Sequence, residues 1–297
     1  MMIGTVRRPR CFPVALKLRT SRRGVILIAV LWIVMALSII VTGVTRSVRD
    51  EARMLGAARQ SVQACATGDA AIQIALQELA AQPQPLDGLV NTAVQYRGSV
   101  IGVEVMPLNG LIDLNGAQLP LLTKLFTVAG QLPVAGAEQL AQAVVEYRSQ
   151  PTPQGARRRF EVAEDLLRIP GVNYDLYARL SRLVTADIRS SGGVNPMAAP
   201  PEVLAVLAGG NLQLAGQIAR QRGTGQPGVD ISGLDSSMLS TGRVRRYRLT
   251  ARVPLPEGGA VRVARFVDLA PRAQDGMPWT TFHIQREVEP IEHRPTS

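Results

Sequence analysis

The sequence is poor in the side chains that most catalytic and metal sites require. It has two cysteines, Cys11 and Cys65, and two histidines, His283 and His293. Cys11 lies in a basic N-terminal leader, so a chain that loses this leader holds one thiol and no intrachain disulfide. Two histidines in a polar, proline-containing terminus supply almost no material for a Ser-His-Asp triad or a zinc site. The sequence therefore predicts a protein that is not an enzyme, and we assign no catalytic residue.

Charged side chains are also scarce and unevenly distributed. They make up 19% of the 297 residues, whereas 46% are hydrophobic, which is enough for one large or two ordinary cores. The formal charge of +10 suggests a nucleic-acid or membrane-surface partner. However, 7 of the 33 basic residues precede residue 25, where there is no acid, leaving 33 − 7 = 26 against 23 acids. The body of the chain is close to neutral, and no nucleic acid is expected as a partner.

The strongest signal is a run of 21 residues, 25–45, without a charged side chain. As a helix it would extend about 31 Å, the thickness of the hydrocarbon core of a bilayer. Arg46 follows the run where a cleaved secretory signal would have a small-x-small site. The positive-inside rule places the N terminus in the cytoplasm and the chain after Arg46 in the far compartment. We expect a single-pass membrane helix, and a buried helix of a soluble protein is the alternative.

The helical pattern continues beyond this run as an amphipathic segment. Apolar residues recur there mainly at spacings of three and four, while arginine and glutamine occupy the other face. The apolar positions are Val48, Ala52, Leu55, Ala58, Val62, Cys65, Ile72, Leu76 and Leu79. The first proline after the run is Pro83, so one helix over 25–81 would have 57 residues and a length of about 85 Å. An anchor with such a continuation is typical of a pilin-like subunit.

Two segments have the alternation of β-hairpins. In the first, Ile101, Val103 and Val105 alternate with other residues, and Asn109-Gly110 supplies a tight turn before 111–114. In the second, 246–253 leads through a turn at 254–259 to 261–269. The segment between the hairpins is helical in pattern.

We therefore expect an α+β fold in which a pilin-like long N-terminal helix, with a transmembrane half and an amphipathic half, packs on a small antiparallel sheet. An inserted all-α domain, similar to SAM or helix-hairpin-helix domains, interrupts the sheet. The expected boundaries are a cytoplasmic leader at 1–24, a transmembrane helix at 25–45, an amphipathic helix and first hairpin at 46–114, the insert at 115–239, the second hairpin at 240–270 and a polar, mobile tail at 271–297.

The insert contains a weak internal repeat. Asn115-Gly116-Ala117 precedes two helical patterns that end at Arg148, and Met197-Ala198-Ala199 precedes two that end at Arg222. Repetition of a helix pair indicates that each unit buries its apolar face on the other.

Between the two units, 166–172 is similar to a helix-hairpin-helix turn, a motif that binds DNA phosphates in some proteins. This copy lacks a second glycine after Gly171, and Asp175 lies where an anion would approach. Arg179 and Arg182 are available, but they are equally consistent with solvated helix faces. The turn therefore favours packing over nucleic-acid binding.

Several stretches resemble the K-type minor pseudopilins of type II secretion systems, the general secretion pathway protein K family. They are RRGVILIAVLW at 22–32, LIDLNGA at 111–117, and the longer segments 164–185 and 194–207. The junction before Val25 resembles the class III signal peptides that a prepilin peptidase cleaves after glycine. The resemblance implies cleavage between Gly24 and Val25, with N-methylation of Val25. Ala29 stands where most pilin-like subunits have glutamate, and the K-type family is similar in lacking it.

The resemblance implies a subunit at the pseudopilus tip that initiates assembly for protein export across the outer membrane. The implied partners are the I- and J-type minor pseudopilins, an H-type subunit, the major pseudopilin, the prepilin peptidase and exported proteins. The implied location is the inner membrane, with the C-terminal domain in the periplasm. Two alternatives stay open, a membrane-anchored helix-hairpin-helix protein that binds or takes up DNA, and a minor pilin of a type IV pilus.

No cofactor is firmly expected. Members of the family bind calcium, which takes oxygen ligands. The oxygen ligands could include Asp230, Asp235, Glu257 and Asp268. No spacing among these residues forms a recognisable calcium loop, so the metal site stays unknown and no ligand is assigned.

Overall fold

The computed structural model describes residues 22–153, 155–188, 192–223, 228–269 and 276–289, with the side chains of 22–25 and 43–48 left out. The chain divides into two compact units, Met1–Arg59 and Gln60–Ser297. Residues 1–21 of the expected leader lie outside the described residues.

A single helix, α1, covers Arg22–Ala80 and confirms the long helix expected over 25–81. It ends just before Pro83, which has no N–H to continue the helix, and the N–H groups of residues 81 and 82 bond the carbonyls of Gln77 and Leu79 in the final turn. In the second unit, Ile72 and Leu76 are fully buried, as the spacing predicts. None of the helices in the described part of the chain is long and apolar enough to cross a membrane. The membrane span at 25–45 stays a prediction.

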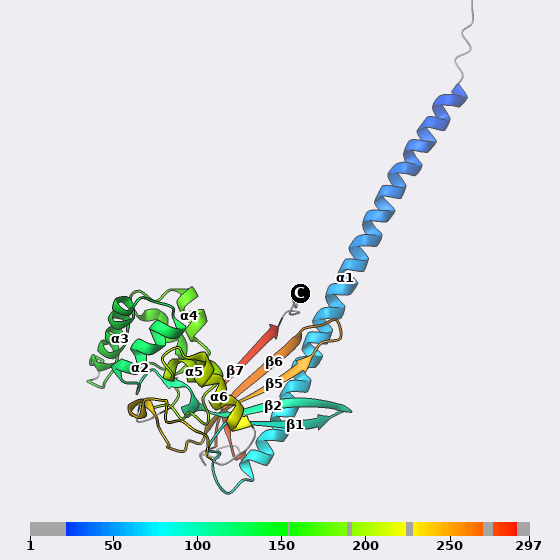
Figure 1. Cartoon of the computed structure of the whole chain (residues 1–297). Coiled ribbons are helices and arrows are strands. Elements are labelled where there is room, and N and C mark those ends of the chain that lie inside the picture. Colours follow the sequence, from blue (N-terminus) through cyan, green and yellow to red (C-terminus); the bar gives the residue numbers. More distant parts are fainter. Residues whose placement is uncertain (1–21, 154, 189–191, 224–227, 270–275, 290–297) are drawn as a thin grey trace, which may run out of the picture. The chain divides into compact units, whose positions relative to one another are not determined.

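The second unit contains a five-stranded antiparallel sheet with the order β1-β2-β5-β6-β7 (Figure 1). The strands are β1 (Val90–Tyr96), β2 (Ser99–Pro107), β5 (Arg246–Pro254), β6 (Ala260–Asp268) and β7 (Thr280–Glu289). Residues 60–80 of α1 pack on one face, where Val103, Leu249 and Val263 share a core with Ile72 and Leu76. The opposite face of β6 presents Ala264 and Phe266 to a second core.

The second hairpin is confirmed and the first is corrected. β5 and β6 pair antiparallel around the expected turn at 254–259. By contrast, β2 does not turn at Asn109-Gly110; it pairs with β1 through Arg97-Gly98, whose φ angles are +49° and +80°. Asn109-Gly110 instead belongs to a short 3₁₀ turn, η1 (Leu108–Gly110). Asn109-Gly110 does not mark a hairpin here because Gly110 lies where two backbones approach closely.

The expected mobile tail at 271–297 is wrong for 280–289, because these residues form β7 and pair with β6 along the strand. The sequence of this strand resembles a polar tail, because its charged side chains find their partners only in segments that are far away in the sequence. Glu287 bonds Arg182 at 2.6 Å, and Arg286 bonds Asp69 at 3.2 Å. Residues 270–275 and 290–297 lie outside the described residues.

The segment between β2 and β5 is largely helical. Its elements are β3 (Ile112–Asp113), α2 (Leu119–Lys124), the π-helical turn η2 (Leu125–Ala129), α3 (Val134–Ser149), η3 (Ala163–Arg168), α4 (Tyr174–Leu180), β4 (Val184–Thr185), α5 (Pro201–Leu207), α6 (Leu212–Gly223) and η4 (Ser236–Met238). The all-α expectation is corrected, because β3 and β4 form a parallel pair. A separate inserted domain is not confirmed, since Met106 of β2 and Phe266 of β6 share the insert's core.

Candidate functional site

Each half of the insert begins with the same hydrogen-bonded turn. In the first half, Oδ1 of Asp113 accepts a bond from the backbone N–H of Asn115 at 3.0 Å. In the second half, Oδ1 of Asn195 accepts one from the N–H of Met197, also at 3.0 Å. The offset is 195 − 113 = 82 residues, and the predicted alignment of Asn115 with Met197 has the same offset. The internal repeat is confirmed, and an Asp or Asn side chain closes each turn.

A partly buried arginine at the end of each helix pair returns to this turn. Arg148 donates from Nη1 to the carbonyl of Leu114 at 3.0 Å and from Nη2 to that of Ala117 at 2.6 Å. Arg222 donates from Nη1 to the carbonyls of residues 196, 197 and 199 at 3.2, 3.1 and 2.7 Å. Burial lowers the pKa of both guanidinium groups, although arginine stays charged. Each cation therefore satisfies carbonyl oxygens at the start of its own repeat.

The two halves meet through a reciprocal pair of glycine contacts. A Cβ atom on Gly110 would overlap the backbone carbonyl of Ala198, and one on Gly192 would overlap that of Gly116. Since 110 + 82 = 192 and 116 + 82 = 198, each contact is the counterpart of the other. This reciprocity is what a two-fold relation between the halves requires. The sequence predicts the repeat but not this contact.

Within the LIDLNGA motif at 111–117, Asn115 holds three segments of the chain together. The Asn115 amide donates to the carbonyls of Phe160 and Ala186 at 2.9 and 3.1 Å, and its Oδ1 accepts from the Phe160 N–H at 2.9 Å. Phe160 is 1% exposed. Asn115 therefore fixes the chain that arrives from α3 and the chain that leaves β4.

The predicted helix-hairpin-helix turn is a reversal between the short helices η3 and α4. Gly171, with φ +94°, makes the reversal, and Asn173 caps α4 by accepting the Leu176 N–H at 2.8 Å. Arg182, one of the two arginines considered for phosphate contact, bonds Glu287 at 2.6 Å. The helix start is thus capped from within the chain and Arg182 is already paired, which favours the packing interpretation.

The carboxylates considered for calcium are engaged separately. Asp230 and Asp235 each accept bonds from the N–H and hydroxyl of the serine two residues later, Ser232 or Ser237. These bonds lower the pKa of both carboxyl groups. Asp268 bonds Arg246 at 2.8 Å, and Glu257 lies in the β5–β6 turn. Within the described ranges, no cluster of three His, Cys, Asp or Glu side chains could hold a metal.

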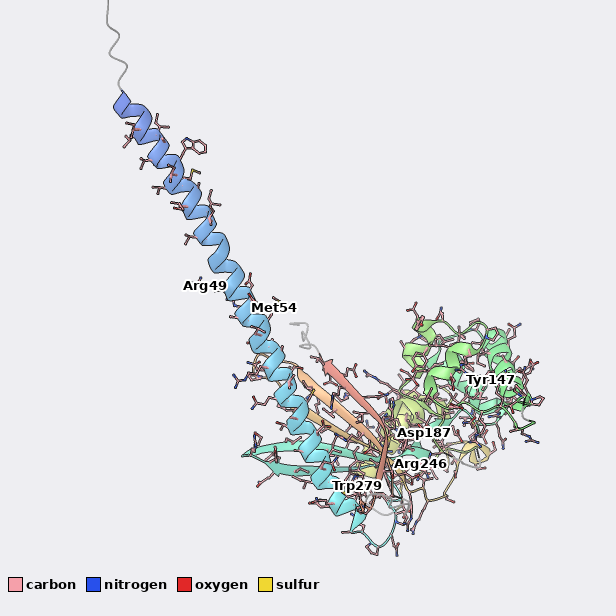
Figure 2. The ribbon with its side chains drawn as sticks, turned by 180° about the vertical axis from the view of Figure 1, so that it is seen from behind. Arg49, Met54, Tyr147, Asp187, Arg246 and Trp279 are labelled. Carbon is pink, nitrogen blue, oxygen red and sulfur yellow. The ribbon has the colours of Figure 1, made fainter. Side chains whose placement is uncertain are left out.

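Arg246 joins the insert to the sheet (Figure 2). Its Nε donates to Asp268 on β6 at 2.8 Å, its Nη1 donates to the backbone carbonyl of Asp187, and its guanidinium lies 5.3 Å from the centroid of the Phe282 ring. Burial raises the pKa of the Asp187 carboxyl, while Arg246 and His283 oppose this shift. The junction is therefore a partly buried polar contact in which ionised Asp187 is disfavoured.

Asp69 makes a second polar junction that the sequence does not reveal. Its carboxylate on α1 bonds Nε of Arg265 on β6 at 2.9 Å and Nη2 of Arg286 on β7 at 3.2 Å. Only the break in the apolar spacing of the helix at Asp69 marks the residue in the sequence. The carboxylate fixes the helix against β6 and β7.

The first unit presents an apolar helical surface. The large apolar side chains between Ile26 and Val41 are 51–72% exposed, and all the described side chains of 26–42 are exposed. An apolar surface of this kind usually marks contact with lipid or other protein. The predicted processing residues, Gly24 and Val25, belong to the first turn of α1, with side chains outside those described. Their cleavage stays a prediction.

The chain is similar in structure to a chain in the crystal structure of the GspK-GspI-GspJ complex from the type 2 secretion system of enterotoxigenic Escherichia coli. The similarity covers 82% of this chain and 99% of that chain, with 14% sequence identity and a TM-score of 0.46. No family model matches the sequence, and no curated protein matches it. At this identity and TM-score, the similarity does not by itself assign a function.

Proposed function

We propose that this chain is a minor pseudopilin of a type II secretion system, with a structural rather than an enzymatic role. The observation that carries the proposal is the order of features along α1. The basic Arg22-Arg23-Gly24 junction precedes an apolar stretch, and the same helix then becomes amphipathic and packs on an antiparallel sheet. This order suits a helix that is first held in lipid and later packs among equivalent helices.

In the proposed pathway, the precursor lies in the inner membrane with 25–45 spanning it and the second unit in the periplasm. The prepilin peptidase cleaves after Gly24, and Val25 becomes the N-methylated first residue. The helix then leaves the lipid for a bundle with the I- and J-type and other pseudopilins. Because lipid contacts are replaced by contacts between apolar helices, this transfer costs little hydrophobic free energy.

The insert supports a position at the tip. It lies within the segment between the neighbouring strands β2 and β5 and shares a core with the sheet, so it cannot fold away from the subunit. A subunit with this bulk would obstruct another subunit stacked above it. Ala29 is consistent with the tip as well, since a subunit with no neighbour ahead has no partner amine for a buried carboxylate.

Processing of a Gly24→Val variant tests the proposal. In cells with a prepilin peptidase, we expect the wild-type chain to yield a product whose N-terminal residue is methylated Val25, and Gly24→Val to remain at precursor length by mass spectrometry. Gly56→Ala in the same helix is the control, because a Cβ there would meet no atom within 4 Å. Normal cleavage of Gly24→Val, or failure of the mature chain to co-purify with neighbouring pseudopilins, would contradict the assignment.

A further inference from the structure

Residues 150–153 and 155–159 of the insert form the two sides of a tight hairpin, and the second side ends in three consecutive arginines, 157–159. The N–H of Arg158 bonds the carbonyl of Gln150 at 2.9 Å. Towards the tip, the N–H of Thr152 bonds the carbonyl of Ala156 at 2.6 Å, and the N–H of Ala156 bonds Oγ1 of Thr152 at 3.1 Å. The arginines are therefore presented on a hydrogen-bonded backbone.

The middle arginine is held against the insert. Its guanidinium lies 5.0 Å from the centroid of the Tyr147 ring and donates to Oε1 of Gln150 at 2.8 Å. The buried Phe160 ring packs on the same tyrosine, with ring centroids 4.8 Å apart. Tyr147, labelled in Figure 2, belongs to α3. Because side chains alternate in extended chain, Arg157 and Arg159 lie on the side opposite Arg158, and both are exposed.

The two outer arginines differ from the arginines of the sheet. Each arginine in β5, β6 and β7 has a carboxylate partner within 4 Å, and these partners are Asp69, Glu104, Asp268 and Glu289. Among the residues that the structure describes, neither Arg157 nor Arg159 has an ion pair. Arg168, which lies near the same tyrosine, is already bonded to Asp165 at 3.1 Å. Two guanidinium groups are thus free to meet carboxylates from outside the chain.

We propose that Arg157 and Arg159 form a docking surface for an acidic segment of another protein. Arginine forms paired hydrogen bonds with a carboxylate, and this geometry makes it more selective than a point charge. Alternate residues of an extended chain lie about 6.6 Å apart, so a partner strand with carboxylates on every second residue would match the two arginines. Arg158 and Phe160 are already held in place by their contacts with Tyr147. The hairpin therefore loses little conformational entropy when a partner binds.

A protein segment fits this surface better than a nucleic acid does. Binding through the phosphate backbone gains its affinity from about 6–10 phosphate contacts, and this hairpin offers two free cations. The proposal goes beyond the secretion role, because the surface does not depend on processing or on the helix bundle.

Fluorescence anisotropy with the full chain in detergent tests the proposal. The probe is a fluorescein-labelled peptide of alternating Glu and Thr, measured at about 50 mM and about 500 mM salt. The double variant Arg157→Glu, Arg159→Glu is compared with Arg179→Glu, Arg220→Glu, which changes the net charge equally at exposed insert positions. Circular dichroism melts check that both variants fold.

We expect the wild-type chain to bind the peptide in a salt-dependent manner. The hairpin variant should lose about tenfold or more in affinity, and the control pair should stay within about twofold. Equal loss in both variants would show attraction by net charge alone and overturn the proposal, as would absence of binding. A labelled single-stranded oligonucleotide of the same charge is the second probe. If it bound more tightly through the same two arginines, the partner class proposed here would be wrong.

Discussion

Replacing Gly110 by alanine tests the reciprocal contact between the halves of the insert. The new Cβ would overlap the carbonyl of Ala198, a backbone group that cannot rotate away. Overpacking a core costs about 1–3 kcal/mol, and the rigid neighbour places this variant near about 3 kcal/mol. In a unit of 297 − 60 + 1 = 238 residues, each kcal/mol lowers the melting temperature by about 2–4 °C. We therefore expect a fall of about 6–12 °C.

Gly102→Ala is the matched control, eight positions earlier. Gly102 lies in β2, and a Cβ there would meet no atom within 4 Å. Alanine inside an element is favoured over glycine by about 0.5–1 kcal/mol, so this variant should melt at or slightly above the wild-type temperature. Circular dichroism melts of the full chain in one detergent compare the two variants. If they melted together, close packing of the two backbones would not explain the glycine at 110.

Three further variants test local features of the second unit. Arg222→Met should lower the free energy of unfolding by about 2 kcal/mol in urea titrations, because the carbonyls that Arg222 satisfies lose their donor. The control, exposed Arg220→Met, should change this free energy by no more than about 0.5 kcal/mol. Equal losses in the two variants would refute the role of the Arg222 hydrogen bonds. Gln131→Gly should raise the free energy of unfolding by about 0.5–1 kcal/mol, because Gln131 has φ +56°, a conformation that glycine adopts at less cost than glutamine. A loss of stability would indicate a contact made by the Gln131 side chain. Burial raises the pKa of Asp187, so its ionisation costs stability as pH rises above the ordinary carboxyl range. Asp187→Asn should therefore raise the urea midpoint at pH 7. It should not raise the midpoint at about pH 3, where the carboxyl is protonated in both the folded and the unfolded state. A gain of the same size at both pH values would show that the charge of Asp187 is not the cause.

The sequence predicts the elements that can be recognised from a repeating pattern of apolar and polar residues within one segment. The long helix follows from apolar spacing and from the position of Pro83, and the β5–β6 hairpin follows from alternation around a glycine-containing turn. The internal repeat is also visible, because its residues keep an offset of 82 through the apolar positions of α2 and α5. In each case the signal lies within one segment or its copy.

The missed features depend on contacts between distant segments. β7 reads as a tail because its charges are satisfied by Asp69 and Arg182, which lie far away in the sequence. Asn109-Gly110 reads as a hairpin turn, although glycine is needed there for approach to Ala198. Arg148 and Arg222 occur at the end of each repeat in the sequence, and this equivalence was the available signal for their shared role.

The shared core explains why the insert and the sheet form one packed body and the insert is not an appended module. Ala264 and Phe266 alternate along β6 with Val263 and Val267, which face α1, so one strand serves two cores. Arg246 adds a polar link between the same strand and the insert. A force on α1 would therefore reach the insert through packed side chains and ion pairs instead of a flexible linker. In a subunit drawn out of the membrane by its helix, as proposed here, this construction would move the insert and the sheet together.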